Sequence, residues 1–178
     1  LGSSFGGPLA TMLAAGEPQR VRGLILCASF VRSPRPALHR YRHAAAWPVV
    51  GALRAARRVP VWLGRSQGRS FRHAKAETWT RVPARSLAAR LRSVIAVDAR
   101  EALLACAQPI AYVRYEADGV VLPASFDEVL KLKPELRCYS LPGAHLGMHA
   151  DGAALARVVS EFVGEGPEAR ACGAHPSP

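Results

Sequence analysis

The chain has 178 residues, 49% of them hydrophobic, and a formal net charge of +11 at neutral pH. This composition supplies enough apolar material for one hydrophobic core and excludes a globally disordered chain. No run of about 18 apolar residues occurs, so we expect no membrane-spanning helix, and the first residues lack the charged-then-apolar order of a secretory signal. The cysteines lie far apart without a C-x-x-C pair, which favours buried free thiols and a cytoplasmic protein. They are Cys27, Cys106, Cys138 and Cys172.

The pattern of apolar residues predicts helices and strands that alternate along the chain. Residues 5–15 lack β-branched side chains apart from Thr11 and precede Gly16, a common helix end, so a helix is expected there. The apolar run over residues 21–28 is typical of a strand buried on both faces of a parallel sheet. Further helices are expected over residues 51–58, 85–96, 98 to about 106, 124–132 and 152–163, and further strands over residues 109–115 and 136–141.

The positive charge is concentrated in the middle of the chain. Between Arg32 and Arg100, 16 Lys or Arg residues stand against two acidic residues. Prolines divide this segment into short stretches, which predicts a cap of small helices over residues 32–97, inserted between core segments 1–31 and 98–163. The Gly, Pro and Ala-rich residues 164–178 predict a disordered tail.

Two interpretations of the basic segment stay open. Arginines on solvated helix faces need no ligand, whereas a positive surface attracts an acidic partner through its long-range field. If the partner is an acidic acyl-carrier protein, Arg54, Arg57 and Arg58 are the candidate basic patch. A basic module that binds nucleic acid or a membrane surface is the competing class, but zinc-finger spacings, RNP-type aromatic strings and heptads are absent from the sequence, so no specific nucleic-acid partner is expected.

The first residues hold the pattern Gly-x-Ser-x-Gly directly before the first expected helix. This pattern is typical of a nucleophile elbow, in which a strand turns sharply into a helix and exposes a serine hydroxyl. Ser4 is the candidate nucleophile, and Gly2, Gly6 and Gly7 are the small residues expected to let two backbone segments approach. The backbone N–H of Phe5 is the expected oxyanion donor.

Two further polar residues follow predicted strands. Asp118 lies in the polar turn of residues 116–119, after the strand over residues 109–115, and His145 lies in a loop that begins at Pro142. The carboxyl ends of parallel strands meet at one edge of a sheet, where open α/β folds build their sites. Taken alone, Asp118 before Gly119 is a common turn pair, and His145 is a loop histidine that the backbone can satisfy.

The order Ser4, Asp118, His145 resembles that of the α/β-hydrolases, and three strings carry the resemblance: GSSFGG at residues 2–7, YEADGVVLP at 115–123 and LPGAH at 141–145. They are most similar to the carboxylesterases and the pimeloyl-carrier-protein methyl ester esterases. The resemblance implies a partial α/β-hydrolase fold over residues 1 to about 163, with a mostly parallel sheet, flanking helices and an inserted helical cap.

That resemblance also implies roles for the residues. Ser4 is then the nucleophile, His145 the general base and acid, and Asp118 the orienting carboxylate, in a serine esterase that acts on a small or carrier-linked acyl ester without a cofactor or a metal. The family's first strands and the loop with the second oxyanion donor would precede Leu1. We therefore expect the isolated chain to have little or no activity.

Other functions of the same residues stay open. Acyl transfer to an alcohol or thiol uses the same acyl-enzyme as hydrolysis. His149 and Asp151 follow His145 at a spacing that suggests metal ligands, but no thiolate or carboxylate cluster completes the set, so no metal is expected.

Overall fold

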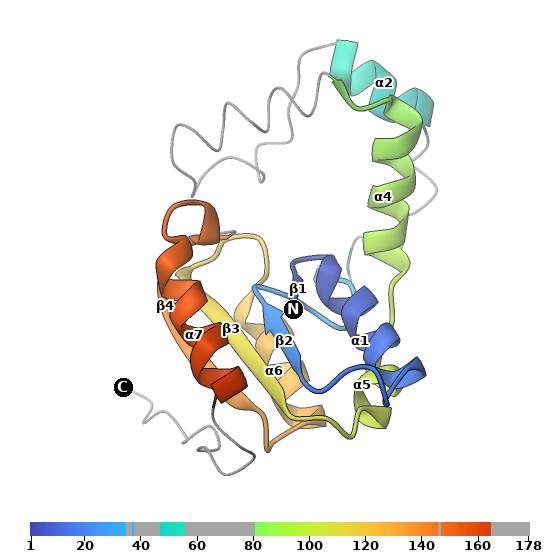
Figure 1. The fold of residues 1–178 in the computed structure, drawn as a ribbon. Helices are drawn as coiled ribbons and strands as arrows, with labels where there is room; N and C mark the ends of the chain where they lie inside the picture. The colour runs from blue at the N-terminus through green and yellow to red at the C-terminus, as the bar shows by residue number, and fades with distance from the viewer. Residues whose placement is uncertain (35–36, 38–46, 56–80, 146, 165–178) are drawn as a thin grey trace.

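Four parallel strands form the sheet at the centre of the structure, in the order β1-β2-β3-β4 (Figure 1). The computed structural model describes residues 1–34, 37, 47–55, 81–145 and 147–164. The strands are β1 (Gly2–Ser3), β2 (Leu24–Cys27), β3 (Ile110–Ala117) and β4 (Arg137–Ala144). The predicted mostly parallel sheet with flanking helices is therefore confirmed.

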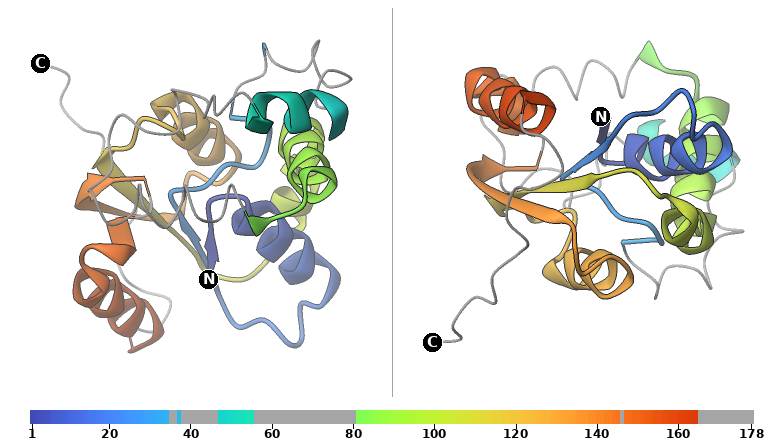
Figure 2. Two further views of the ribbon diagram at one scale, coloured as in Figure 1. Left: turned by 90° about the horizontal axis from the view of Figure 1, so that it is seen from above. Right: turned by 60° about the horizontal axis from the view of Figure 1, so that its bottom comes forward.

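Helices cover both faces of this sheet (Figures 1 and 2). On one face lie α1 (Gly6–Gly16), α5 (Arg100–Ala105) and α6 (Pro123–Leu132), and on the other lies α7 (Gly152–Gly164), after the short 3₁₀ helix η3 (Gly147–His149). The remaining helices, α2 (Trp47–Ala55) and α4 (Ala84–Ala96), pack against each other at the top of Figure 1. None of the described helices is long and apolar enough to cross a membrane.

β2 and the first half of β3 are buried on both faces, and this explains why their sequences do not alternate between apolar and polar residues. In β2, Leu24 and Leu26 join the core cluster of α1, α5 and α6, while Ile25 and Cys27 join the cluster of α7. The hydrophobic effect therefore holds helices against the sheet from both sides.

Most predicted elements are present, with shifted ends. β2 is shorter than residues 21–28, and α2 begins before residue 51. β4 continues past the predicted end at Leu141, so the expectation that a loop begins at Pro142 is wrong. The reason is an irregularity in the pairing with β3, whose register shifts between Tyr115 and Ala117. Gly143 has a φ of +120°, so Pro142 and Gly143 bulge out of the pairing and the strand pairs again at Ala144.

The two ends of the predicted cap lie side by side. Arg32 and Asp98 form an antiparallel bridge, and the N–H of Ala99 donates to the carbonyl of Val31 at 2.7 Å. The helix expected from residue 98 begins at Arg100, after the N-cap residue Ala99, and the Asp98 carboxylate accepts the Arg100 N–H at 3.2 Å. The division into core, cap and tail stays a prediction.

Several predictions fall outside the described residues: Arg57, Arg58, the side chain of Arg54 and the tail from residue 165. Cys27 and Cys106 are buried free thiols, as expected. Cys138 is disulfide-bonded, so the expectation of a free thiol at this position is wrong. The cytoplasmic location stays a prediction.

Two adjacent leucines in α5 test how much the core contributes to stability. Leu103 is fully buried and Leu104 is 54% exposed. We expect Leu103→Ala to lower the free energy of unfolding by about 2–5 kcal/mol, because it leaves a cavity in the core. The matched control Leu104→Ala should change it by less than about 0.5 kcal/mol. Urea unfolding followed by circular dichroism measures both, and equal losses would contradict this packing.

Candidate active site

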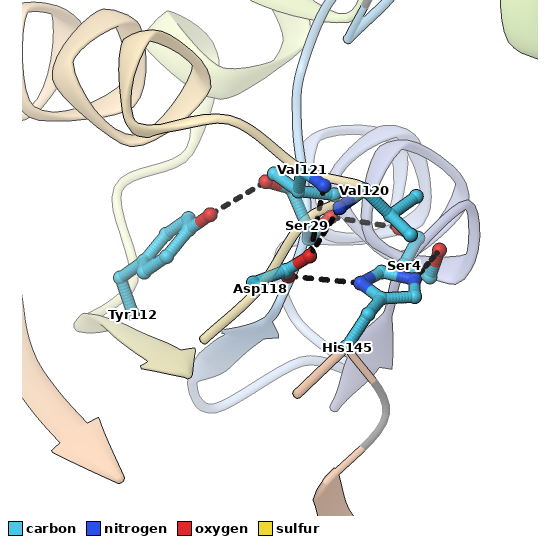
Figure 3. Close-up of polar contacts among 7 residues, drawn as sticks. All are labelled: Ser4, Ser29, Tyr112, Asp118, Val120, Val121 and His145. Carbon is cyan, nitrogen blue, oxygen red and sulfur yellow. Dashed lines mark hydrogen bonds and ion pairs between the residues drawn. The ribbon is translucent and has the colours of Figure 1, made fainter. Parts of the chain in front are cut away.

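Each of the three predicted catalytic residues directly follows the last residue of a parallel strand. Ser4 follows β1, Asp118 follows β3 and His145 follows β4. Because parallel strands end at one edge of their sheet, three segments that are distant in sequence place these side chains together. Figure 3 shows the three residues converging at this edge.

Ser4 has an unusual backbone conformation. Its φ is +50°, in the left-handed region that residues with a Cβ rarely adopt. The Ser4 N–H donates to the carbonyl of Cys27 at 2.9 Å, and the Ser4 carbonyl accepts the N–H of Gly7 at 3.0 Å. β1 therefore turns sharply into α1 at Ser4, as the sequence pattern predicted.

Two of the three predicted elbow glycines lie where a side chain does not fit. A Cβ at Gly2 would lie 2.6 Å from the carbonyl oxygen of Gly6, and a Cβ at Gly7 would overlap the hydroxyl of Ser29. Gly6 differs, because a Cβ there would meet nothing within 4 Å. The prediction that Gly6 must lack a side chain for two segments to approach is therefore wrong. Gly6 takes part in the close approach through its carbonyl oxygen, which lies near Gly2.

The three side chains form a continuous hydrogen-bonded chain. His145 Nε2 lies 3.0 Å from Ser4 Oγ, and His145 Nδ1 lies 2.9 Å from Asp118 Oδ2 (Figure 3). The side chains of His145 and Asp118 are only 6% and 7% exposed. A carboxylate only accepts hydrogen bonds, so Nδ1 carries the proton and Nε2 of the neutral ring is left to accept the Ser4 hydroxyl proton.

The second oxygen of Asp118 is held by the backbone of the turn that follows it. Asp118 Oδ1 accepts the N–H of Val120 at 2.8 Å and that of Val121 at 3.0 Å. Both carboxylate oxygens thus have partners, which offsets the cost of burying the charge and fixes which oxygen faces His145. The common turn role of Asp118 and its contact with His145 are therefore compatible.

Phe5 is the residue before α1, with φ −62° and ψ −17°. Its N–H belongs to the peptide that joins it to Ser4, at the N-terminus of an 11-residue helix. Helix N-termini carry partial positive charge, so this is a favourable place for an oxyanion.

Sequence reasoning missed two residues that contact this region. The Ser29 hydroxyl donates to the Ser4 carbonyl at 2.8 Å, and the Tyr112 hydroxyl donates to the Ser29 carbonyl at 2.6 Å. Ser29 lies two residues after β2, so a polar residue just past a buried strand was the signal that could have identified it. The sequence held no signal for Tyr112, which lies inside β3.

Metal binding gains no support from the geometry around His149. Among the described residues, no group of three or more His, Cys, Asp or Glu side chains is placed to hold a metal ion. Asp151 Oδ1 instead accepts the N–H of Ala154 at 2.9 Å, in the first turn of α7. This contact is typical of helix capping.

The structure is similar to several solved enzymes. An enol-lactonase from Burkholderia xenovorans LB400 matches 92% of this chain with a TM-score of 0.67 and 20% identity, and the match covers 64% of that enzyme. A thermophilic esterase from Thermogutta terrifontis matches 91% of this chain with a TM-score of 0.69 and 20% identity, over 62% of its own length. An α/β hydrolase from a Medee basin deep-sea metagenome library matches 93% of this chain with a TM-score of 0.72 and 16% identity, over 64% of its length.

These similarities establish the fold. The chain spans less than two thirds of the length of these enzymes. No family model and no curated protein matches the sequence. The expectation of a partial α/β-hydrolase fold, drawn from three short strings, is confirmed.

Gly2 and Gly6 form a matched pair to test the elbow. We expect Gly2→Ala to lower the free energy of unfolding by about 1–3 kcal/mol, because the new Cβ meets backbone atoms that cannot rotate away. Gly6→Ala should cause no loss, since the space at its Cβ is open. Chemical denaturation measures both variants, and a tolerated Gly2→Ala would show that the turn is looser than described.

Proposed function

We propose that this chain, which has the α/β-hydrolase fold over the part that it spans, belongs to a serine hydrolase that cleaves carboxylic esters through an acyl-enzyme. The proposal depends on one observation, the hydrogen-bonded chain Ser4–His145–Asp118 at the carboxyl edge of the sheet. The proposed substrate is a small-molecule or carrier-linked acyl ester, and no cofactor enters the proposed reaction.

The first half of the reaction forms an acyl-enzyme. A serine hydroxyl is a weak nucleophile at neutral pH, so His145 Nε2 removes its proton as Ser4 Oγ attacks the ester carbonyl carbon. Asp118 keeps the proton on Nδ1 and stabilises the imidazolium that forms. His145 then gives its proton to the departing alkoxide, and Ser4 is left acylated.

The second half releases the acid. Water, activated by the same His145 Nε2, attacks the acyl carbon, and the proton returns to Ser4 as the carboxylic acid leaves. In both halves the carbonyl oxygen becomes an oxyanion, for which the Phe5 N–H is the proposed donor. One such donor contributes about 2.7–4 kcal/mol to transition-state stabilisation.

The proposed activity belongs to a polypeptide that supplies the rest of such a fold. α1 exposes three large apolar side chains, Leu9, Met12 and Leu13, at 54%, 41% and 58%. An apolar helix face of this kind marks a surface that another segment covers. The 178 residues alone should accordingly have little activity, and the assays below use an extended polypeptide that supplies the remaining part of such a fold, with the 178 residues alone for comparison.

The hydrolysis of p-nitrophenyl esters from acetyl to octanoyl tests the proposal directly. We expect the extended polypeptide to be active and its Ser4→Ala variant to lose activity, because the Ser4 hydroxyl is the one that contacts His145 Nε2 at 3.0 Å. Ser3→Ala is the matched control and should keep its activity, since the Ser3 hydroxyl is buried without a hydrogen-bond partner in the described structure. Activity that survives Ser4→Ala would overturn the assignment.

Asp118→Asn tests the role of the carboxylate. Since Val120 and Val121 donate to Oδ1, the asparagine carbonyl oxygen should occupy that position and its NH₂ should face His145. The ring must then accept at Nδ1 and protonate at Nε2, which is the tautomer that cannot take the Ser4 proton. We expect kcat to fall by about 10⁴-fold with the fold retained. Steady-state kinetics and circular dichroism measure this, and a loss under tenfold would contradict the role.

A further inference from the structure

The carbonyl of Ser4 is held by a side chain from outside the elbow. It accepts the Ser29 hydroxyl at 2.8 Å in addition to the Gly7 N–H at 3.0 Å. The Ser29 hydroxyl has a second acceptor, the carbonyl of Phe30, only at 3.4 Å. Because a hydroxyl has a single proton to donate, the shorter contact with Ser4 is the favoured one.

This contact acts on the proposed oxyanion donor through a rigid peptide group. The Ser4 carbonyl and the Phe5 N–H belong to one planar trans peptide, in which they point in opposite directions. A donor that fixes the carbonyl therefore fixes the direction of the N–H as well. Hydrogen bonding at the carbonyl also polarises the peptide and strengthens its N–H as a donor.

Ser29 is itself fixed in place. It is fully buried, and its carbonyl accepts the Tyr112 hydroxyl at 2.6 Å (Figure 3). Tyr112 is 2% exposed in the middle of β3. Burial raises the pKa of its hydroxyl above the usual value, so Tyr112 keeps its proton and donates throughout the neutral range. On its other side, the Ser29 hydroxyl lies where a Cβ on Gly7 would be.

We propose that Ser29 is a positioning residue for the oxyanion donor: its hydroxyl orients the Ser4–Phe5 peptide so that the Phe5 N–H faces the developing oxyanion, and Tyr112 anchors Ser29 from β3. This inference rests on the proposed function. It predicts that the hydroxyls of Ser29 and Tyr112, neither of which contacts His145 in the described hydrogen bonds, affect the transition state more than substrate binding.

The test compares a ground-state and a transition-state readout. A trifluoromethyl ketone adds to Ser4 Oγ and forms a tetrahedral adduct with an oxyanion. In Ser29→Ala we expect kcat to fall, and the inhibition constant of this ketone to rise, by about tenfold, which is less than the loss of a whole oxyanion donor. KM should change less than twofold, and the pH dependence of kcat/KM should keep its midpoint because the His145–Asp118 contact is unchanged. Tyr112→Phe should act in the same direction with a smaller effect.

Thr11→Val is the matched control for a general loss of stability. Thr11 is fully buried, and its hydroxyl donates to the Gly7 carbonyl at 2.9 Å without touching the Ser4 peptide. It should lower the melting temperature as the test variants do, yet leave kcat and the affinity for the ketone unchanged.

The outcomes separate the two levels of the proposal. Wild-type kcat and ketone affinity in both Ser29→Ala and Tyr112→Phe would overturn the positioning role, as would losses that Thr11→Val reproduces. If the Ser29 variant does not fold, the nearly isosteric Tyr112→Phe decides the question. If the wild-type protein hydrolyses esters and Ser4→Ala does not, the proposed function stands whatever the Ser29 and Tyr112 variants show. An extended wild-type polypeptide that neither hydrolyses esters nor binds the ketone overturns both.

Discussion

The site depends on the backbone of Ser4, which is held in a conformation that costs about 1–3 kcal/mol for a residue with a side chain. Hydrogen bonds on both sides of the residue offset this cost. The Ser4 N–H donates to the Cys27 carbonyl, and the Ser4 carbonyl accepts from the Gly7 N–H and the Ser29 hydroxyl. Cys27 and Ser29 belong to β2 and to the segment after it. The neighbouring strand therefore maintains the strain that projects the Ser4 hydroxyl toward His145.

Polar groups at this edge are buried with their partners already in place. A buried carboxylate is costly unless hydrogen bonds replace its hydration, and Asp118 has three, from two backbone N–H groups and from His145. The arrangement is preorganised, because these donors are already in place for the charge that the proposed reaction would develop on His145. The large positive charge of the chain plays no part in these contacts.

The sequence was informative where a signal is local. The elbow pattern predicted the turn at Ser4, and the ends of apolar runs predicted that Asp118 and His145 lie at one edge of the sheet. Both signals depend on residues that are neighbours in sequence. The end of β4 was mispredicted, since its irregularity at Gly143 arises from the pairing with β3. The contact between Tyr112 and Ser29 joins residues 83 positions apart, and although the place of Ser29 after a buried strand was a signal, no local pattern links it to Tyr112. The open space at Gly6 is likewise a property of the packed structure.

The distances along the chain within the site have a consequence for how it forms. Ser4 and His145 are separated by 141 positions, and Asp118 and His145 by 27. Each strand that pairs with its neighbour lowers the entropy cost of closing a contact that spans so much of the chain. In a partly folded species in which β4 is not on the sheet, Ser4 therefore has no His145 beside it. The proposed chemistry would thus require β4 to be in place on the sheet.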